Sequence, residues 1–183
     1  MTSASIARKV SGRSLLPLLV ALLLPLLSLA PARAEEGEPI VLTPAIGVEN
    51  GGIAFGANLR YFFLPNLAGE IDGAYGDSLC QNCRLSATTL TGNLVYEIHP
   101  IDRLALYAAA GGGAALLDLS SPRSARATLG EVDCGAGIIF ALSSSVGISL
   151  EDRWFLPVSG AIPDASPGAI TLDRIFLGVS VGF

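Results

Sequence analysis

Residues 174–183 read RIFLGVSVGF, and this stretch indicates the fold more directly than any other. Its apolar side chains recur at every second position, from Ile175 through Leu177, Val179 and Val181 to Phe183. A period of two is typical of a β-strand with one face in an apolar environment. We therefore expect the chain to end as a strand of a sheet, with this face covered by apolar material.

The first 34 residues have the pattern of an export signal. A basic segment with Arg8, Lys9 and Arg13 precedes an apolar run over residues 15–29, and an Ala-x-Ala cleavage motif ends at Ala34. The alternative is an uncleaved membrane anchor, but the run is short for a spanning helix and two prolines interrupt it. We expect residues 1–34 to be a cleaved signal peptide, which leaves one domain, 35–183, of 183 − 34 = 149 residues.

The mature chain is strongly acidic. All sixteen Asp and Glu residues lie after residue 34, whereas four of the eleven basic residues precede it, so the net charge is 7 − 16 = −9. Such a surface repels nucleic acid, and we expect no nucleic-acid partner. After residue 34 no apolar run approaches the ~20 residues of a transmembrane helix. An apolar exported chain of this kind indicates strands, because in lipid only helices and closed barrels satisfy the backbone.

Eight segments have the length and alternation of barrel strands. They cover about 40–49, 53–63, 67–76, 86–99, 104–117, 127–141, 146–156 and 169–183. In the second segment, Phe55, Leu59 and Tyr61 alternate with Asn58 and Arg60. In membrane barrels, apolar side chains face the lipid and alternate with polar side chains that face the lumen. The connections also alternate between short turns and mostly long loops, which places both termini in the periplasm.

Two groups of residues on these strands allow more specific predictions. The adjacent charges Glu151, Asp152 and Arg153 cannot all face the lumen, so we expect a bulge or a position at the rim there. Aromatic residues at 61–63, and Tyr75 and Trp154 at the other end, suit the two aromatic bands of a membrane barrel.

A resemblance to a known family rests on these patterns. Residues 104–118, LALYAAAGGGAALLD, the central strands and the terminal Phe183 resemble the small eight-stranded outer-membrane barrels of the OmpA/OmpX-like superfamily. The resemblance covers the mature chain and implies an all-β, antiparallel, up-and-down transmembrane barrel in the bacterial outer membrane. It also implies insertion by the barrel assembly machinery, with Phe183 as the C-terminal assembly signal.

The charged residues expected inside the barrel number seven acids and three arginines. They are Glu49, Arg60, Glu70, Asp72, Glu97, Glu131, Asp133, Glu151, Arg153 and Arg174. One interpretation is a cation-selective pathway, and the other is a hydrated plug of ion pairs. We favour the plug, because eight strands enclose a space that side chains can fill. Glycines such as Gly135 and Gly137 would leave room for the longer side chains.

Cys80 and Cys83 lie in an expected external loop. A β-turn brings positions i and i+3 within disulfide range, and exported proteins meet an oxidising compartment, so we favour a disulfide. A free pair or a redox CxxC site is the alternative. A metal site would need about four ligands, and Cys134 and His99 belong to other parts of the barrel. We expect neither a metal nor a cofactor.

No catalytic arrangement is evident. Nucleophilic catalysis needs a serine and a histidine base within reach, but His99 falls in a turn without serine. Glu131 and Asp133 point the same way, yet lumen alternation explains this equally well. We expect a protein that is not an enzyme.

Arg84, Arg123 and Arg126 lie at or beside the expected external loops. Arginine binds phosphate well, so these residues could contact lipopolysaccharide, although ordinary solvated charges explain them as well. The sequence thus predicts a non-enzymatic outer-membrane barrel with a plugged lumen, whose loops contact the envelope surface or an unidentified extracellular partner. The alternatives are a small-solute or cation channel and a soluble, lipocalin-like periplasmic carrier.

Overall fold

The computed structural model describes residues 39–77, 84–121, 124–160 and 171–183. Within these ranges the chain forms eight strands. They are β1 (Ile40–Glu49), β2 (Gly52–Leu64), β3 (Leu67–Gly76), β4 (Arg84–Ile101), β5 (Leu104–Ser121), β6 (Ala125–Ala141), β7 (Val146–Ser159) and β8 (Leu172–Gly182). No helix in the described part of the chain is long and apolar enough to span a membrane.

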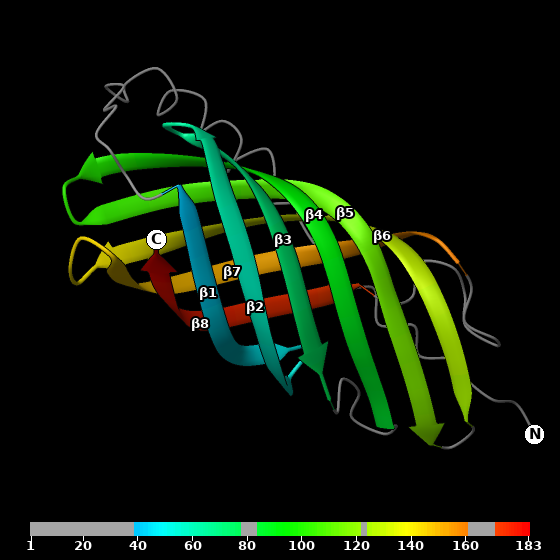
Figure 1. The fold of residues 1–183 in the computed structure, drawn as a ribbon. Coiled ribbons are helices and arrows are strands. Elements are labelled where there is room, and N and C mark those ends of the chain that lie inside the picture. The colour runs from blue at the N-terminus through cyan, green and yellow to red at the C-terminus, as the bar shows by residue number, and fades with distance from the viewer. Residues whose placement is uncertain (1–38, 78–83, 122–123, 161–170) are drawn as a thin grey trace, which may run out of the picture. The chain divides into compact units, whose positions relative to one another are not determined.

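The strands form one closed barrel in which each strand runs antiparallel to the next, and β8 returns to pair with β1 (Figure 1). The predicted all-β, eight-stranded up-and-down barrel is therefore confirmed. The signal peptide predicted for residues 1–34 lies outside the described residues and stays a prediction.

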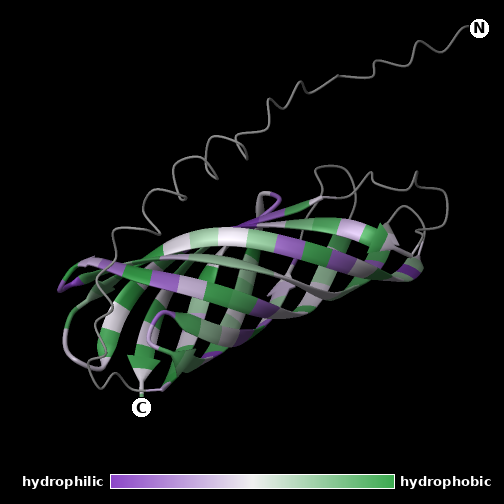
Figure 2. Ribbon diagram, turned by 90° about the horizontal axis from the view of Figure 1, so that it is seen from above, coloured by the Kyte–Doolittle hydropathy of each residue, from purple (hydrophilic) through white to green (hydrophobic). Residues whose placement is uncertain are grey.

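Alternation along each strand separates two faces. On β2, Phe55, Leu59 and Tyr61 are about half exposed on the outer wall, whereas Asn58 and Arg60 are buried in the interior. Hydrophobic and hydrophilic positions alternate along the ribbons in Figure 2. Because successive side chains of a strand point to opposite faces, this pattern requires an apolar outer wall and a polar interior.

The two ends of the barrel differ, and we call them the turn end and the loop end. The turn end holds the connections at residues 65–66, 102–103 and 142–145, the start of β1 and the end of β8. The loop end holds the connection at 50–51, the ends of β3, β5 and β7, and the starts of β4, β6 and β8. At residues 50–51, Asn50 and Gly51 have φ angles of 47° and 86°. Two positive φ values in a two-residue connection match the twist of a tight hairpin.

Strands β4, β5, β6 and β7 extend further at the loop end than predicted. The prediction ended them where the lipid-facing pattern stops, but strand pairing continues to Ser121 on β5 and begins at Ala125 on β6. In the loop-end parts of β4–β6, which include these extensions, the polarity of the faces is reversed. Leu85, Leu117 and Leu129 face the interior there, so apolar and polar residues still alternate but the apolar side chains point inward.

Two other expectations are corrected. No bulge occurs near Asp152, which pairs with Ala136 on β6 and Ile175 on β8 in unbroken register. The regular pleat buries Glu151 and Arg153 on the inner face and turns Asp152 to the outer wall, where it is half-buried. Phe62 does not join an outer aromatic band, because it packs against the buried cluster that contains Tyr107.

Candidate functional site in the barrel interior

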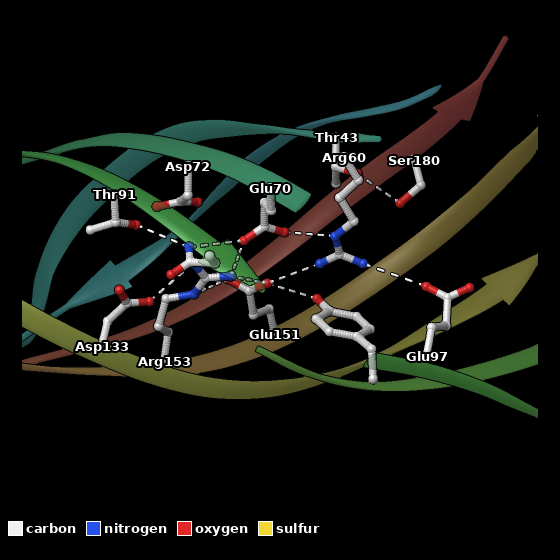
Figure 3. Close-up of polar contacts among 12 residues, drawn as sticks. Thr43, Arg60, Glu70, Asp72, Thr91, Glu97, Asp133, Glu151, Arg153 and Ser180 are labelled. Atoms are coloured by element: carbon white, nitrogen blue, oxygen red, sulfur yellow. Dashed lines mark hydrogen bonds and ion pairs between the residues drawn. The ribbon is translucent and has the colours of Figure 1, made fainter. Parts of the chain in front are cut away.

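Alternation directs all ten predicted lumen charges to the inner face. Each has a relative exposure of 7 % or less, and Glu49 and Arg153 are at 0 %. Burial of this many charges needs ion pairing or hydrogen bonding to offset desolvation. The structure brings eight of the ten into contacts with one another. Figure 3 shows the contacts around Arg60 and Arg153.

Arg60 on β2 forms the part of this network nearest the turn end. Its Nε lies 2.6 Å from Glu70 Oε2, and its Nη2 lies 3.4 Å from Glu151 Oε2. Glu97 Oε2 is 3.7 Å from Nη1. The guanidinium also stacks 3.8 Å from the ring centroid of Tyr107, whose hydroxyl donates a 2.8 Å hydrogen bond to Glu151. Arg60 thus joins β2, β3, β4, β5 and β7.

Arg153 on β7 occupies the centre of the network. Its Nη2 donates to Glu70 Oε1 at 2.7 Å and to Glu151 Oε2 at 3.0 Å. Its Nη1 donates to Asp133 Oδ2 at 3.3 Å. Because Glu70 belongs to β3, this contact crosses the interior instead of following a neighbouring strand. Asn93 on β4 adds a 3.2 Å hydrogen bond to the same Glu70 oxygen.

Arg174 on β8 makes a second cross-barrel ion pair. Its Nη2 lies 2.5 Å from Asp72 Oδ1 on β3, and its Nη1 donates to Thr89 Oγ1 at 3.3 Å. The guanidinium lies 4.5 Å and 4.8 Å from the ring centroids of Phe176 and Phe155. Aromatic faces attract a desolvated cation, so these rings help to hold Arg174 in the interior.

Apolar clusters pack against the charged residues. The cluster at the loop end comprises Leu85, Ala87, Ala115, Leu117, Leu129, Phe155 and Leu172. The cluster nearer the turn end comprises Ala68, Val95, Tyr107 and Ala109, with Phe62 and Ile139 packed against it. Phe155 and Tyr107, one from each cluster, contact the arginines directly, so the apolar and charged side chains of the interior form one packed structure.

Glu49 and Glu131 differ from the other lumen acids. Among the described residues, no arginine lies within ion-pair distance of either carboxylate, whereas each of the other five acids contacts at least one arginine. Glu49 also has no hydrogen-bond partner for either carboxylate oxygen in the described part of the chain. Arg174 is the register partner of Glu49 across the β1–β8 seam, but its Nη2 points to Asp72. The interior therefore contains a paired region around the three arginines and a region of acids without an arginine contact.

Sequence reasoning missed the aromatic members of the network. Tyr107, Phe155 and Phe176 face inward and contact the arginines. Tyr107 carried a signal, since its register partner on β6 is Gly137. A Cβ at Gly137 would overlap the Tyr107 ring, so the glycine provides space for this side chain.

The other predicted positions fall elsewhere. Cys80, Cys83 and Arg123 lie outside the described residues, so the disulfide stays a prediction. Arg84 begins β4, and exposed Arg126 pairs with Asp118 on the outer wall at 2.8 Å. The backbone N–H of Phe183 donates to Ile40 O at 2.9 Å, which ties the end of the chain to β1.

The described residues show no side-chain group suited to metal binding. They contain no group of three or more His, Cys, Asp or Glu side chains placed to hold a metal ion. His99 is half exposed at the turn end, where its Nε2 lies 3.2 Å from Glu97 Oε1. A charged network of this kind can fill and rigidify the interior.

Comparison with known proteins bears on the fold. No protein-family model matches the chain, and no curated protein matches it in sequence. Among solved structures, Neisserial surface protein A superposes with a TM-score of 0.61 at 12 % identity, over 79 % of this chain and 94 % of that one. OprG from Pseudomonas aeruginosa gives 0.59 at 11 % identity, over 84 % and 99 % of the two chains. The N-terminal β-barrel domain of OprF from the same species gives 0.57 at 16 % identity, over 81 % and 100 %.

The fold is that of the small outer-membrane barrels. The resemblance to the OmpA/OmpX-like barrels is confirmed at this level, because identities of 11–16 % establish the fold alone. The three barrels are matched over 94–100 % of their own length.

Proposed function

We propose that this protein is a non-enzymatic integral protein of the bacterial outer membrane. Its interior is closed by ion pairs, and its loop end faces the outside of the cell, where it contacts the envelope surface or a partner. The apolar outer wall supports the membrane location, because residues such as Ile53, Ile71 and Leu90 are about 60 % exposed there. The charged interior disfavours a soluble lipocalin-like carrier, whose pocket would be apolar.

The main support for a closed interior is the position of Arg153. It is 0 % exposed and contacts Glu70 from the far side of the barrel as well as Asp133 and Glu151. Ions crossing the barrel would have to break these contacts. Eight strands enclose a lumen that side chains can fill, so such a network suffices to close it.

The first test concerns location and closure of the barrel. The protein, expressed with its own residues 1–34, should fractionate with the outer membrane and migrate faster on a gel before boiling than after. A protein found in the soluble periplasmic fraction without such a mobility shift would overturn the proposal in favour of the soluble carrier.

The second test separates a closed barrel from a channel. The surplus of acids represented by Glu49 and Glu131 favours cation conduction as the alternative function. We expect no stepwise conductance from the purified barrel in planar bilayers. Cation-selective steps that disappear in a Glu49→Gln/Glu131→Gln variant would establish the channel instead.

Biogenesis and orientation form part of the same proposal. Residues 1–34 act as a cleaved signal peptide, both barrel termini lie in the periplasm, and the assembly machinery recognises the strand that ends at Phe183. The alternating outer face of β8 supports this, as does the exposure of the Phe183 side chain at 60 %. Deleting Phe183 should lower the amount of heat-modifiable protein in the outer membrane, and unchanged assembly would contradict its role as a signal.

A further inference from the structure

The loop-end parts of β4, β5 and β6 have a mostly hydrophilic outer face. Ser86, Thr88, Asp118, Arg126 and Thr128 point outward there, whereas the inner face carries the apolar cluster with Leu117 and Leu129. Two residues nearer the middle of β4, the outer face becomes apolar at Leu90, which is 62 % exposed. The outer wall therefore changes from lipid-facing to water-facing within one or two residues on these strands.

A groove lies where the outer wall changes from apolar to hydrophilic. It has a volume of about 460 Å³ and is lined on the outer wall by residues of β3, β4, β5 and β6. Two consecutive rows of the sheet form its floor. One row runs through Tyr75, Thr88, Leu116 and Thr128, and the next runs through Ser86, Asp118 and Arg126. Rows two residues apart along a strand are ~6.6 Å apart, so both can contact one ligand.

The two rows offer different chemistry. The first presents the ring of Tyr75, which is 47 % exposed, and the side chain of Leu116, which is 56 % exposed. It also presents the hydroxyl groups of Thr88 and Thr128. Aromatic and aliphatic surfaces cover the apolar faces of sugar rings, and hydroxyl groups exchange hydrogen bonds with sugar hydroxyls.

The second row adds a charged pair. Arg126 Nε lies 2.8 Å from Asp118 Oδ2, and 85 % of the Arg126 side-chain surface is exposed. Because the pair uses Nε, the terminal guanidinium nitrogens remain accessible to phosphate oxygens. The Asp118 carboxylate can accept hydrogen bonds from sugar hydroxyls and keeps the groove close to neutral. A ligand with sugar hydroxyls and a phosphate fits this lining better than a simple anion does.

We infer that this groove binds the phosphorylated sugar headgroup of the outer-leaflet glycolipid, lipopolysaccharide. The inference rests on the proposed outer-membrane location and deepens it, since it assigns the envelope contact to a defined site. We choose this ligand because of where the groove lies on the barrel. A groove on the outer wall at the edge of the apolar surface meets the headgroups of lipids whose acyl chains cover Leu90 and its neighbours.

The test uses the full barrel refolded in detergent and titrated with purified short-core lipopolysaccharide by calorimetry. Tyr75→Ala and the double variant Asp118→Ala/Arg126→Ala should each weaken the affinity by about tenfold, the loss expected for a stacking contact or a charge-assisted hydrogen bond. Tyr61→Ala and Arg103→Ala are matched controls, because both residues are exposed near the turn end. These controls should bind like the wild type.

Two further probes identify the part of the ligand that is recognised. Phosphatidylglycerol, an anionic lipid without the sugar core, should bind at least tenfold more weakly and show no dependence on Tyr75. The deacylated core oligosaccharide should also bind more weakly than the intact glycolipid. Equal affinity for the free oligosaccharide would overturn the lipid assignment and make a soluble glycan the ligand.

Failure of this inference is distinguishable from failure of the proposed function. If the variants and the wild type bind lipopolysaccharide equally, while all of them are heat-modifiable and reach the outer membrane, the groove assignment alone is wrong. If the wild type shows no heat-modifiable form in the outer membrane, the location is wrong, and the groove assignment is overturned with it.

Discussion

The paired and unpaired acids of the lumen share burial and the same alternation but differ in their partners. Glu70 accepts hydrogen bonds from Arg60, Arg153 and Asn93, whereas Glu49 is equally buried and has no side-chain partner among the described residues. The alternation of inward and outward residues along a strand places both acids inside and does not distinguish them. The difference teaches that strand alternation selects which residues enter the interior, while the cross-barrel geometry decides which of them stabilise it.

The largest effect should follow from breaking the paired region at Arg153. Arg153→Met leaves Glu70, Asp133 and Glu151 with less compensation in a buried setting. Removing one partner of a buried ion pair costs about 3–5 kcal/mol, so the free energy of unfolding should fall by about that much. Urea unfolding of the barrel in lipid vesicles measures it. A loss below about 1 kcal/mol would mean that the network does not hold the interior together.

A smaller loss is expected when an acid of the paired region is neutralised. Glu70→Gln keeps the shape but weakens the contacts with Arg60 and Arg153, and should lower the free energy of unfolding by about 1.5–3 kcal/mol. The same urea titration applies. If Glu70→Gln and Glu49→Gln have equal effects, the distinction between the two regions is contradicted.

Steric disturbance of the paired region should lower the free energy of unfolding by about 1–3 kcal/mol. In Gly137→Ala the new Cβ would overlap the Tyr107 ring, which must move away from Arg60 and Glu151. Gly92→Ala is the matched control, because no atom lies within 4 Å of its added Cβ. Equal stabilities of the two variants, measured by urea unfolding, would show that the Tyr107 position is not constrained.

The smallest effect is expected in the unpaired region. Glu131→Gln and Glu49→Gln replace a buried carboxyl by an amide of the same shape without breaking an arginine contact, so each should change the free energy of unfolding by at most about 0.5 kcal/mol or increase it. Urea unfolding at neutral pH tests this. A loss comparable to that of Glu70→Gln would show that these acids have partners as important as the arginines.

Much of the fold follows from the sequence for a simple physical reason. On β2 and β6 a period of two separates apolar from polar side chains, and that period fixes both the strand and its faces. The inward positions of Glu70, Asp133 and Arg153 follow from the same rule. Short turns such as residues 65–66 reveal the order of antiparallel neighbours without knowledge of distant contacts.

The pairings inside the lumen could not be predicted in this way. Arg174 meets Asp72 and Arg153 meets Glu70 across the barrel, and these contacts depend on strand tilt and stagger, which alternation does not encode. The extension of β5 to Ser121 was missed because the lipid-facing pattern reverses while pairing continues. A bulge or a rim position was expected near Asp152, and the structure instead accommodates this residue, partly buried, on the outer wall in regular register.

The seam between β1 and β8 has a consequence for how the protein reaches its folded state. Thr43 Oγ1 donates to Ser180 Oγ at 3.0 Å, although 137 positions separate the two residues in the chain. Closing so long a loop carries an entropic cost that no local contact offsets, so barrel closure should be late and slow. Until then the first and last strands present unpaired edges that could join those of another molecule. The seam thus makes productive folding depend on protection of both edges until the ends of the domain meet.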